Sequence, residues 1–423
     1  MSSKMQTLTW KVSRPWLRVF LVFFTLDFIP SLPLAAQAPA VPQTRSRLET
    51  AEPTRIVCLG DSVTGVYYHT GGRRAYPEML QLYLEKVFPQ TQIEVINAGI
   101  SGHTTNEALR RLESDVLSHR PHLVTIMFGL NDMVSLSADQ FEANLNSLVD
   151  QIRAQGAEII LATPNGVIEN AGRPSRKLGE YCEIIFKVGL TRSVPVCPIH
   201  RAYSEYHDLD RRGWRLLFSD EIHPNMDGHR LNARLLGRMV SGKTDSLDDI
   251  GPPEPAIPHS LQRRATGQTL RILAAAPADR PLRTAFSRLN RSIEVEISAW
   301  DISGKSLVEI EESARQIRKR QELDLVVVSV PNDATPGATA SDSEISSFSW
   351  ILNHSLSFGK QEWDVVVIAP SVWGGPLNAQ SSSREEFIRR MTRAQDLSLI
   401  ARNADEEESP EELLVRWLRN QGW

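Results

Sequence analysis

The chain has 423 residues, of which 41% are hydrophobic, so it is longer than one ordinary domain and able to form sizeable cores. Its formal net charge is -4, from 47 basic and 51 acidic residues, and the sequence contains no long basic block to collect phosphate groups. The composition therefore predicts a globular protein of two domains and argues against nucleic acid as a partner.

Residues 1–38 have the pattern of an export signal. Basic residues precede the apolar run 19–24, and small residues suited to cleavage follow at Ala35 and Ala36. Asp27 and Pro30 interrupt the apolar stretch, whereas a permanent spanning helix needs roughly 20 apolar residues. We therefore expect a signal peptide and an exported, periplasmic, extracellular or cell-surface protein with no stable membrane span after processing. An uncleaved N-terminal anchor and a cytoplasmic leader are the alternatives.

Residues 50–242 alternate short apolar runs with helical patterns. Continuous apolar runs are typical of strands that are covered on both faces, so they predict a parallel sheet with crossover helices in an α/β domain. A helix is expected after Ser137, because Ser137 and Gln140 form a capping-box pattern and Gly156 follows as a terminator. The apolar runs are 56–59, 93–96, 123–128, 159–162 and 194–199.

Residues 243–268 are rich in proline and charge, and they are predicted to be a linker. Residues 269–423 are predicted to be a second, smaller α/β domain with a helical pattern over 311–320. Its strand-like runs are 270–275, 325–330 and 365–369.

We interpret the second α/β domain as a degenerate repeat of the first. Three segments match in the same order, and they pair 271–273 with 55–57, 302–305 with 100–103, and 325–333 with 123–132. In this alignment Ala278 stands where Ser62 stands, and no Asp-x-x-His follows. A copy without nucleophile and base is expected to be non-catalytic. The alternative is that two unrelated α/β domains share apolar strands of similar spacing.

Ser62 and His223 are the candidate nucleophile and base. Ser62 follows the apolar run 56–59 directly in a Gly-Asp-Ser sequence, and Asp220 stands three residues before His223. A serine hydroxyl becomes a good nucleophile when an imidazole accepts its proton, and the imidazole needs an orienting acceptor. Asp220 can supply that acceptor.

Four blocks in residues 50–242 together resemble the SGNH hydrolases, also called GDSL esterases. The blocks are 60–62, 97–102, 129–132 and 220–224. The resemblance implies a three-layer αβα sandwich with a parallel sheet, similar to flavodoxin, and an esterase activity. By motif position it implies Ser62, Gly102, Asn131 and His223 as the site residues, with Asp220 completing a triad.

The chemistry of ester cleavage requires hydrogen-bond donors for the oxygen that becomes negative in the tetrahedral intermediate. The candidate donors are the N–H groups of Ser62 and Gly102 and the side-chain amide of Asn131. Each follows a predicted strand, at the edge where open parallel sheets place their sites. Glycine at position 102 also suits a backbone that approaches the substrate closely.

The remaining candidates are weaker. The histidines show no metal-ligand spacing, so we expect neither a metal nor a cofactor. His69 is interpreted as a substrate contact or as part of a flexible loop, His103 as a solvated loop residue, and His229 as the exposed end of a helical turn. Cys182 and Cys197 are able to pair if the compartment is oxidising.

The sequence thus predicts an exported serine esterase that forms an acyl-enzyme. The polar loop 67–74 favours a short acyl group, such as acetyl, on a small polar molecule or a polysaccharide. A lysophospholipase-like or thioesterase-like activity on longer chains stays open, because 216–218 could line an acyl slot or pack in the core. A non-catalytic protein that binds a glycan or a partner is the alternative from another class. If the chain is an enzyme, we expect residues 45–245 to retain activity alone.

Overall fold

The computed structural model describes residues 40–65, 68–289, 293–319, 322–337, 339–356, 362–374, 379–403 and 407–423. The predicted signal peptide or anchor, residues 1–38, lies outside the described residues. Within these ranges, none of the helices combines the length and the hydropathy that a membrane-crossing segment needs.

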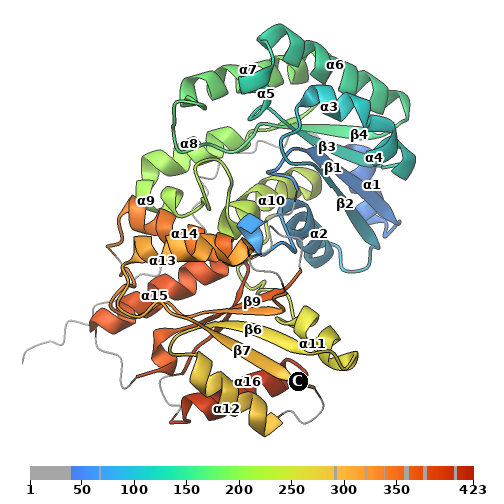
Figure 1. Ribbon diagram of the computed structural model, residues 1–423. Helices are drawn as coiled ribbons and strands as arrows, with labels where there is room; N and C mark the ends of the chain where they lie inside the picture. Colours follow the sequence, from blue (N-terminus) through green and yellow to red (C-terminus); the bar gives the residue numbers. More distant parts are fainter. Residues whose placement is uncertain are drawn as a thin grey trace, which may run out of the picture. The chain divides into compact units, whose positions relative to one another are not determined.

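The first half of the chain, residues 40–242, is built on a parallel sheet with the strand order β2-β1-β3-β4-β5. Helices α1, α2 and α10 cover one face of this sheet, and α3, α6 and α7 cover the other, which gives the expected three-layer sandwich (Figure 1). The strands are β1 (Thr54–Gly60), β2 (Ile93–Gly99), β3 (Leu123–Met127), β4 (Glu158–Ala162) and β5 (Val196–Cys197). The helices are α1 (Pro42–Glu49), α2 (Tyr76–Val87), α3 (Thr105–Arg110), α4 (Leu112–Asp115), α5 (Asp132–Ser135), α6 (Ala138–Ala154), α7 (Ser175–Arg192), α8 (Ile199–Leu209), α9 (Arg211–Arg215) and α10 (Met226–Ser241).

The second half, residues 257–423, is built on another parallel sheet, with the order β7-β6-β8-β9-β10. Alternate residues of these strands enter two apolar cores, as a sheet covered on both faces requires. Helices α11, α12 and α16 cover one core, and α13, α14 and α15 cover the other. The strands are β6 (Leu270–Ala275), β7 (Val295–Trp300), β8 (Leu325–Val328), β9 (Asp364–Ile368) and β10 (Ser398–Ile400). The helices are α11 (Pro258–Ala265), α12 (Asp279–Leu289), α13 (Leu307–Arg315), α14 (Asp342–Ser355), α15 (Ala379–Ala394) and α16 (Pro410–Asn420).

The strand order and register of the two sheets correspond. Ile56 pairs with Leu123 in the first sheet, and Ile272 pairs with Leu325 in the second. The second strand of each half, β2 and β7, leads into a turn with a left-handed glycine, Gly102 at φ 78° and Gly304 at φ 68°. Each turn is followed by a helix with a capping box, α3 and α13. These correspondences support the interpretation of the second half as a degenerate repeat.

Helix α11 lies inside the stretch 243–268 that the sequence predicts as a linker. Its N-terminus is fixed by Asp364 of β9, whose carboxylate accepts hydrogen bonds from the N–H groups of His259 and Ser260 at 3.1 and 2.7 Å. Glu158 of β4 holds the N-terminus of α1 in the same way, at 3.0 and 2.6 Å. Pro258 stands at the start of α11, where proline is favoured because its missing N–H would have no partner in the helix.

Helix α10 follows directly on the 220–224 block and packs on α2. The closeness of this packing can be tested by its effect on stability. A Cβ atom at Gly237 of α10 would lie 2.4 Å from the ring of Tyr83 on α2, whereas one at Gly179 of α7 would meet nothing within 4 Å. We expect Gly237→Ala to lower the free energy of unfolding by about 1–3 kcal/mol through overpacking. The matched control Gly179→Ala is expected to raise it by roughly 0.5–1 kcal/mol through helix propensity.

Urea unfolding of both variants measures these changes. Equal stabilisation by the two substitutions would show that α10 does not pack closely on α2.

Candidate active site

The nucleophile candidate Ser62 stands in a tight turn after β1. The carbonyl of Asp61 accepts hydrogen bonds from the N–H groups of Thr64 and Gly65 at 3.2 and 2.9 Å, and its carboxylate accepts one from Val63 at 2.9 Å. A Cβ atom at Gly60 would lie 1.9 Å from the Thr64 hydroxyl, so only glycine permits this fold of the chain. The turn leaves Ser62 half-buried at the carboxyl edge of the sheet.

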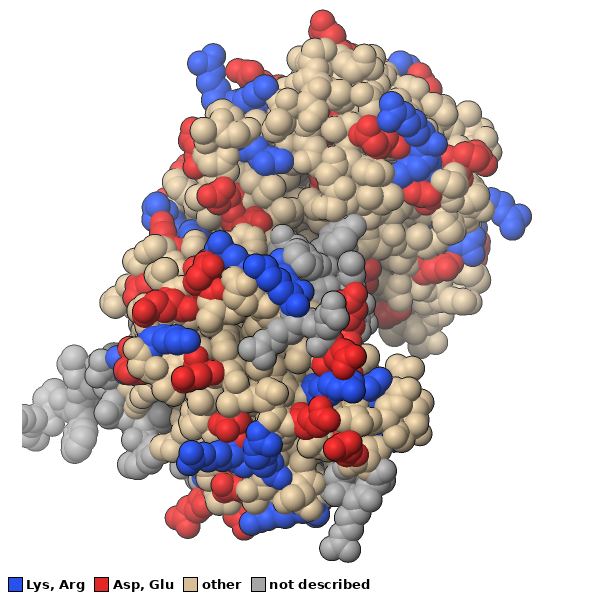
Figure 2. All heavy atoms as spheres, viewed as in Figure 1, with Lys and Arg blue, Asp and Glu red and all other residues tan. Residues whose placement is uncertain are grey.

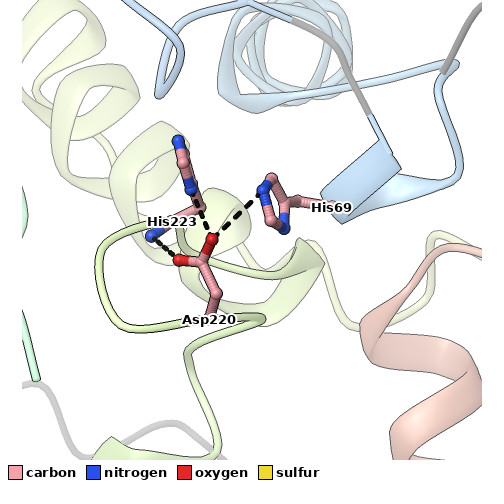
Figure 3. A group of neighbouring side chains, drawn as sticks. All are labelled: His69, Asp220 and His223. Atoms are coloured by element: carbon pink, nitrogen blue, oxygen red, sulfur yellow. Dashed lines mark hydrogen bonds and ion pairs between the residues drawn. The ribbon is translucent and has the colours of Figure 1, made fainter. Parts of the chain in front are cut away.

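The structure brings Ser62, His223 and Asp220 together. His223 Nε2 lies 2.9 Å from Ser62 Oγ, and His223 Nδ1 lies 2.8 Å from Asp220 Oδ2. The other carboxylate oxygen of Asp220 accepts hydrogen bonds from the backbone N–H groups of Ile222 and His223, at 2.8 and 2.7 Å. Figure 3 shows one carboxylate oxygen of Asp220 joined to the backbone nitrogen of His223 and the other joined to its ring. This is the arrangement of a nucleophile, a base and an orienting carboxylate.

Asp220 stays ionised in this environment. Burial acts to raise its pKa, but the hydrogen bond and the charge interaction with His223, together with His69, outweigh burial and lower the pKa below its usual range. An ionised carboxylate is what a protonated imidazole needs beside it, because the negative charge stabilises the imidazolium.

The candidate oxyanion donors keep hydrogens for a substrate. In the part of the chain that the structure describes, the N–H groups of Ser62 and Gly102 have no hydrogen-bond acceptor. Asn131 donates one amide hydrogen to the carbonyl of His103 at 3.0 Å, which leaves its second hydrogen for a substrate oxygen. Gly102 is required for its φ of 78°, and a Cβ atom there would meet no protein atom within 4 Å.

Two arginines that sequence reasoning missed hold the strand ends and the amide. Arg111 is buried, and it donates hydrogen bonds to the carbonyls of Ala98 and Gly60 at 2.8 and 2.9 Å, which ties the ends of β2 and β1 together. Arg173 donates to Asn131 Oδ1 at 3.1 Å and thereby turns the amide hydrogens of Asn131 toward His103 and the site. No motif marks either residue, because each acts on a carbonyl or amide that is distant in sequence.

Asp132 is a third buried support. Its carboxylate accepts hydrogen bonds from the N–H and the hydroxyl of Thr105 at 2.8 and 2.6 Å, and from the N–H of Gly129 at 3.1 Å. These bonds connect the loop that contains Asn131 to the start of α3, which follows Gly102. The two candidate donor loops are therefore fixed to each other.

The structure corrects the interpretations of two histidines. His229 is buried, not exposed, and its Nδ1 accepts a hydrogen bond of 3.0 Å from the N–H of Tyr76. His69 is neither in a flexible loop nor open to substrate: it is buried and its ring stacks on that of His223, with centroids 4.2 Å apart. His103 is partly buried, and its carbonyl accepts a hydrogen bond from the Asn131 amide.

The group His69, Asp220 and His223 contains three atoms of metal-ligand type within 4.8 Å of one another (Figure 3). The rings of His69 and His223 are nearly parallel, at 18°. The in-plane lone pairs of stacked rings run side by side, whereas the nitrogens that ligate a metal converge on one ion. The donor geometry therefore fits a hydrogen-bonded cluster better than a metal site. The three cysteines are unpaired and buried, and burial raises the pKa of each thiol to about 12.

His229 generates a prediction on acid stability. Burial, together with the charge of His223, lowers its pKa from 6.5 to about 3, so the ring is neutral when folded and protonated when unfolded between these values. The unfolded chain then binds more protons, and stability falls as the pH drops below about 6.5, by up to about 1.4 kcal/mol per pH unit for this ring. In His229→Asn, whose side-chain oxygen is able to accept from Tyr76, this part of the slope is expected to disappear.

Urea unfolding at several pH values between about 4.5 and 7.5 measures the difference between the two proteins. His69 and the buried Asp61 also titrate abnormally, but they do so in both proteins and cancel in the comparison. Parallel curves for the two proteins would contradict a neutral, buried His229.

Comparison with known proteins places the chain in a family. Residues 58–231 match the model of the GDSL-like lipase/acylhydrolase family. The chain is 30% identical to an acetylxylan esterase of Geobacillus stearothermophilus over 169 residues, which cover 37% of this chain and 76% of that protein. It is 29% identical to thioesterase 1/protease 1/lysophospholipase L1 of Escherichia coli over 187 residues, 44% of this chain and 82% of that protein.

Solved structures also match part of the chain. The crystal structure of a lipase/acylhydrolase from Enterococcus faecalis has 26% identity and a TM-score of 0.39, and the match covers 45% of this chain and 97% of that one. The family resemblance inferred from the four sequence blocks is confirmed by the family model and the curated relatives. The chain belongs to the GDSL-like lipase/acylhydrolase family and is a hydrolase that acts on ester bonds.

Proposed function

We propose that Ser62, His223 and Asp220 are the catalytic triad and that the protein removes short acyl groups, acetyl above all, from a small polar or carbohydrate substrate. The observation that carries the proposal is the position of the His223 ring, 2.9 Å from the Ser62 hydroxyl on one side and 2.8 Å from the Asp220 carboxylate on the other. One ring thus contacts both the group that loses a proton and the group that stabilises the resulting charge.

The proposed reaction has two stages, acylation of Ser62 and hydrolysis of the acyl-enzyme, and His223 takes up and returns a proton in each. As Ser62 Oγ bonds to the acyl carbon, its proton passes to His223 Nε2, and the carbonyl oxygen becomes negative. The N–H groups of Ser62 and Gly102 and the amide of Asn131 stabilise that oxygen. The intermediate collapses to the acyl-enzyme, and the leaving alcohol takes the proton from His223. Water then attacks in the same way, with His223 as its base, and releases the acid and free Ser62.

The burial of 216–218 supports a short acyl group. Phe218 is fully buried, and its ring packs at 5.7 Å against Tyr203 and at 4.9 Å against Trp214. Leu216 enters an apolar core of the second half. The apolar segment that could have lined a long acyl slot therefore packs in the protein interior. The similarity to an acetylxylan esterase supports an acetyl group on a carbohydrate.

The polar composition of the loop 67–74 is not an argument for a polar substrate, because its arginines bind other parts of the protein. Arg74 forms a bidentate ion pair with Asp396, at 2.6 and 2.8 Å, and Arg73 donates to the carbonyls of Pro253 and Pro255. These side chains serve contacts within the protein, and Tyr67 lies outside the described residues. The similarity to the Escherichia coli thioesterase and lysophospholipase keeps longer acyl chains as the second candidate.

We also propose that the protein is exported. The proposal rests on the basic, apolar and small-residue pattern of residues 1–38. A relative of 33% identity over 126 residues, half the length of that protein, is an uncharacterized lipoprotein of Bacillus subtilis.

An acyl-chain series tests the substrate proposal. We expect kcat/KM for p-nitrophenyl acetate to exceed that for the octanoate by about tenfold or more, because the segment 216–218 packs in the interior and does not line a slot for extra methylenes. Acetylated xylose oligomers should also release acetate. Ser62→Ala is expected to lower kcat by about 10⁴-fold or more, and the matched control Ser118→Ala, at an exposed serine, to leave it unchanged.

A preference for the octanoate would replace the short-chain proposal by the lipid or thioester candidate. Undiminished turnover in Ser62→Ala would contradict the proposed nucleophile.

A further inference from the structure

The loop 219–223 contains the proposed base His223 and its orienting carboxylate Asp220, and it is anchored on the second half of the chain. Ser219 precedes Asp220, and its N–H donates to the carbonyl of His223 at 2.9 Å, which closes the loop 219–223. The Ser219 side chain is fully buried. Asn353 of α14 donates to its hydroxyl oxygen at 3.0 Å, and Gln395, just after α15, donates at 2.8 Å. Both donors are buried residues of the second half.

The hydrogen of the Ser219 hydroxyl needs an acceptor. A serine hydroxyl has one hydrogen and two lone pairs, and the two amides occupy the lone pairs. His69 Nδ1 lies 3.0 Å from the hydroxyl and is able to accept its hydrogen. The hydrogen of His69 is then on Nε2, which faces Asp220 Oδ2 at 3.3 Å. We call Ser219, Asn353, Gln395 and His69 the node. In this assignment the Ser219 hydroxyl has a partner for its hydrogen and for each lone pair. Asn353 Oδ1, at 3.2 Å, is the alternative acceptor of that hydrogen, and Gln395 Oε1 has no hydrogen-bond partner among the described residues.

His69 connects this node to the proposed base. Its ring stacks on His223 at 4.2 Å and at an angle of 18°, and its Nε2 faces the carboxylate oxygen that also contacts His223 (Figure 3). Burial, together with the charge of His223, lowers the pKa of His69 to about 3, so it stays neutral when His223 is protonated. A neutral ring at this place fixes the plane of His223 without adding charge.

Arg215, which precedes the loop 219–223, is also bound to the second half of the chain. Arg215 donates to the Asp342 carbonyl at 3.3 Å and to the Ser346 hydroxyl at 2.6 Å, both at the start of α14. The loop is thus held by the second half both at Ser219 and immediately before it.

We propose that the second half is a positioning part of the active site: Asn353 and Gln395 hold Ser219, and through Ser219 and His69 they orient Asp220 and His223 toward Ser62. The inference rests on the proposed function of this triad. It gives the degenerate repeat a role that needs no nucleophile of its own. It also replaces the expectation that residues 45–245 suffice, because that fragment lacks both amide donors.

A double-mutant cycle on the full chain tests the proposal. Asn353→Leu with Gln395→Met removes both donors and keeps the buried volume, and Ser219→Ala removes the hydroxyl that receives them. Each protein is expected to hydrolyse p-nitrophenyl acetate with a kcat about 10- to 100-fold below wild type and a KM within about twofold, because a small displacement of the base costs rate rather than binding. The triple variant should be no slower than Ser219→Ala, since all three residues act through one hydroxyl.

The matched control is Arg393→Ala on α15. Arg393 donates to the carbonyl of Asp248 at 2.8 Å and does not touch the node, so kcat should be unchanged. A second readout is the deshielded resonance of the proton between His223 and Asp220. We expect it to be sharp in wild type and Arg393→Ala and to broaden through solvent exchange in the node variants, whether or not the ester is a good substrate.

The proposal fails if the node variants keep both the wild-type kcat and the sharp resonance, or if their effects on kcat multiply in the triple variant. Failure of the proposed function has a different signature: the wild-type protein would not cleave the ester, while the resonance would still report on the node. A node variant that does not fold is replaced by the single substitution Gln395→Met, for which a smaller loss of kcat and the same broadening are expected.

Discussion

The hydrogen bond between His223 and Ser62 joins positions 161 residues apart, and the rest of the structure serves to bring those two side chains within 2.9 Å. Ser62 is fixed by the end of β1, where glycine and the Arg111 guanidinium shape the turn. His223 is on a loop, which has no regular structure to fix it. It therefore depends on Asp220, on Ser219 and on the helix α10 that follows.

The second half explains how such a loop is held. We interpret this half as a degenerate repeat with Ala278 at the position of the nucleophile, and its Asn353 on α14 and Gln395 just after α15 bind the loop 219–223. Buried polar groups are costly unless they are paired, so a node of four polar side chains fixes one arrangement more sharply than an apolar contact does. The same physics makes the node sensitive, because the loss of one partner leaves the others unsatisfied.

Local signals in the sequence predicted most of the fold. Apolar runs located eight strands, whereas β7 and β10 were not predicted because they contain no long apolar run. The short edge strand β5, Val196–Cys197, was overestimated as 194–199. At α6 the Ser137 hydroxyl caps the helix as predicted, but the Gln140 side chain bonds to Asn144 instead of completing a capping box. The proposed triad residues were found because they stand in motifs. Arg173 and Gln395 were not found, and His69 was misinterpreted, because the roles of these residues depend on tertiary contacts that no local pattern encodes.

The most direct test of this account is to map the adduct that a fluorophosphonate forms with the folded protein. The reagent reacts only with a serine that a nearby base activates, so peptide mass spectrometry should find it on Ser62, and prior replacement of His223 by alanine should prevent the reaction. An adduct on a different serine, or none on the folded wild-type protein, would show that the contact between Ser62 and His223 does not activate a nucleophile.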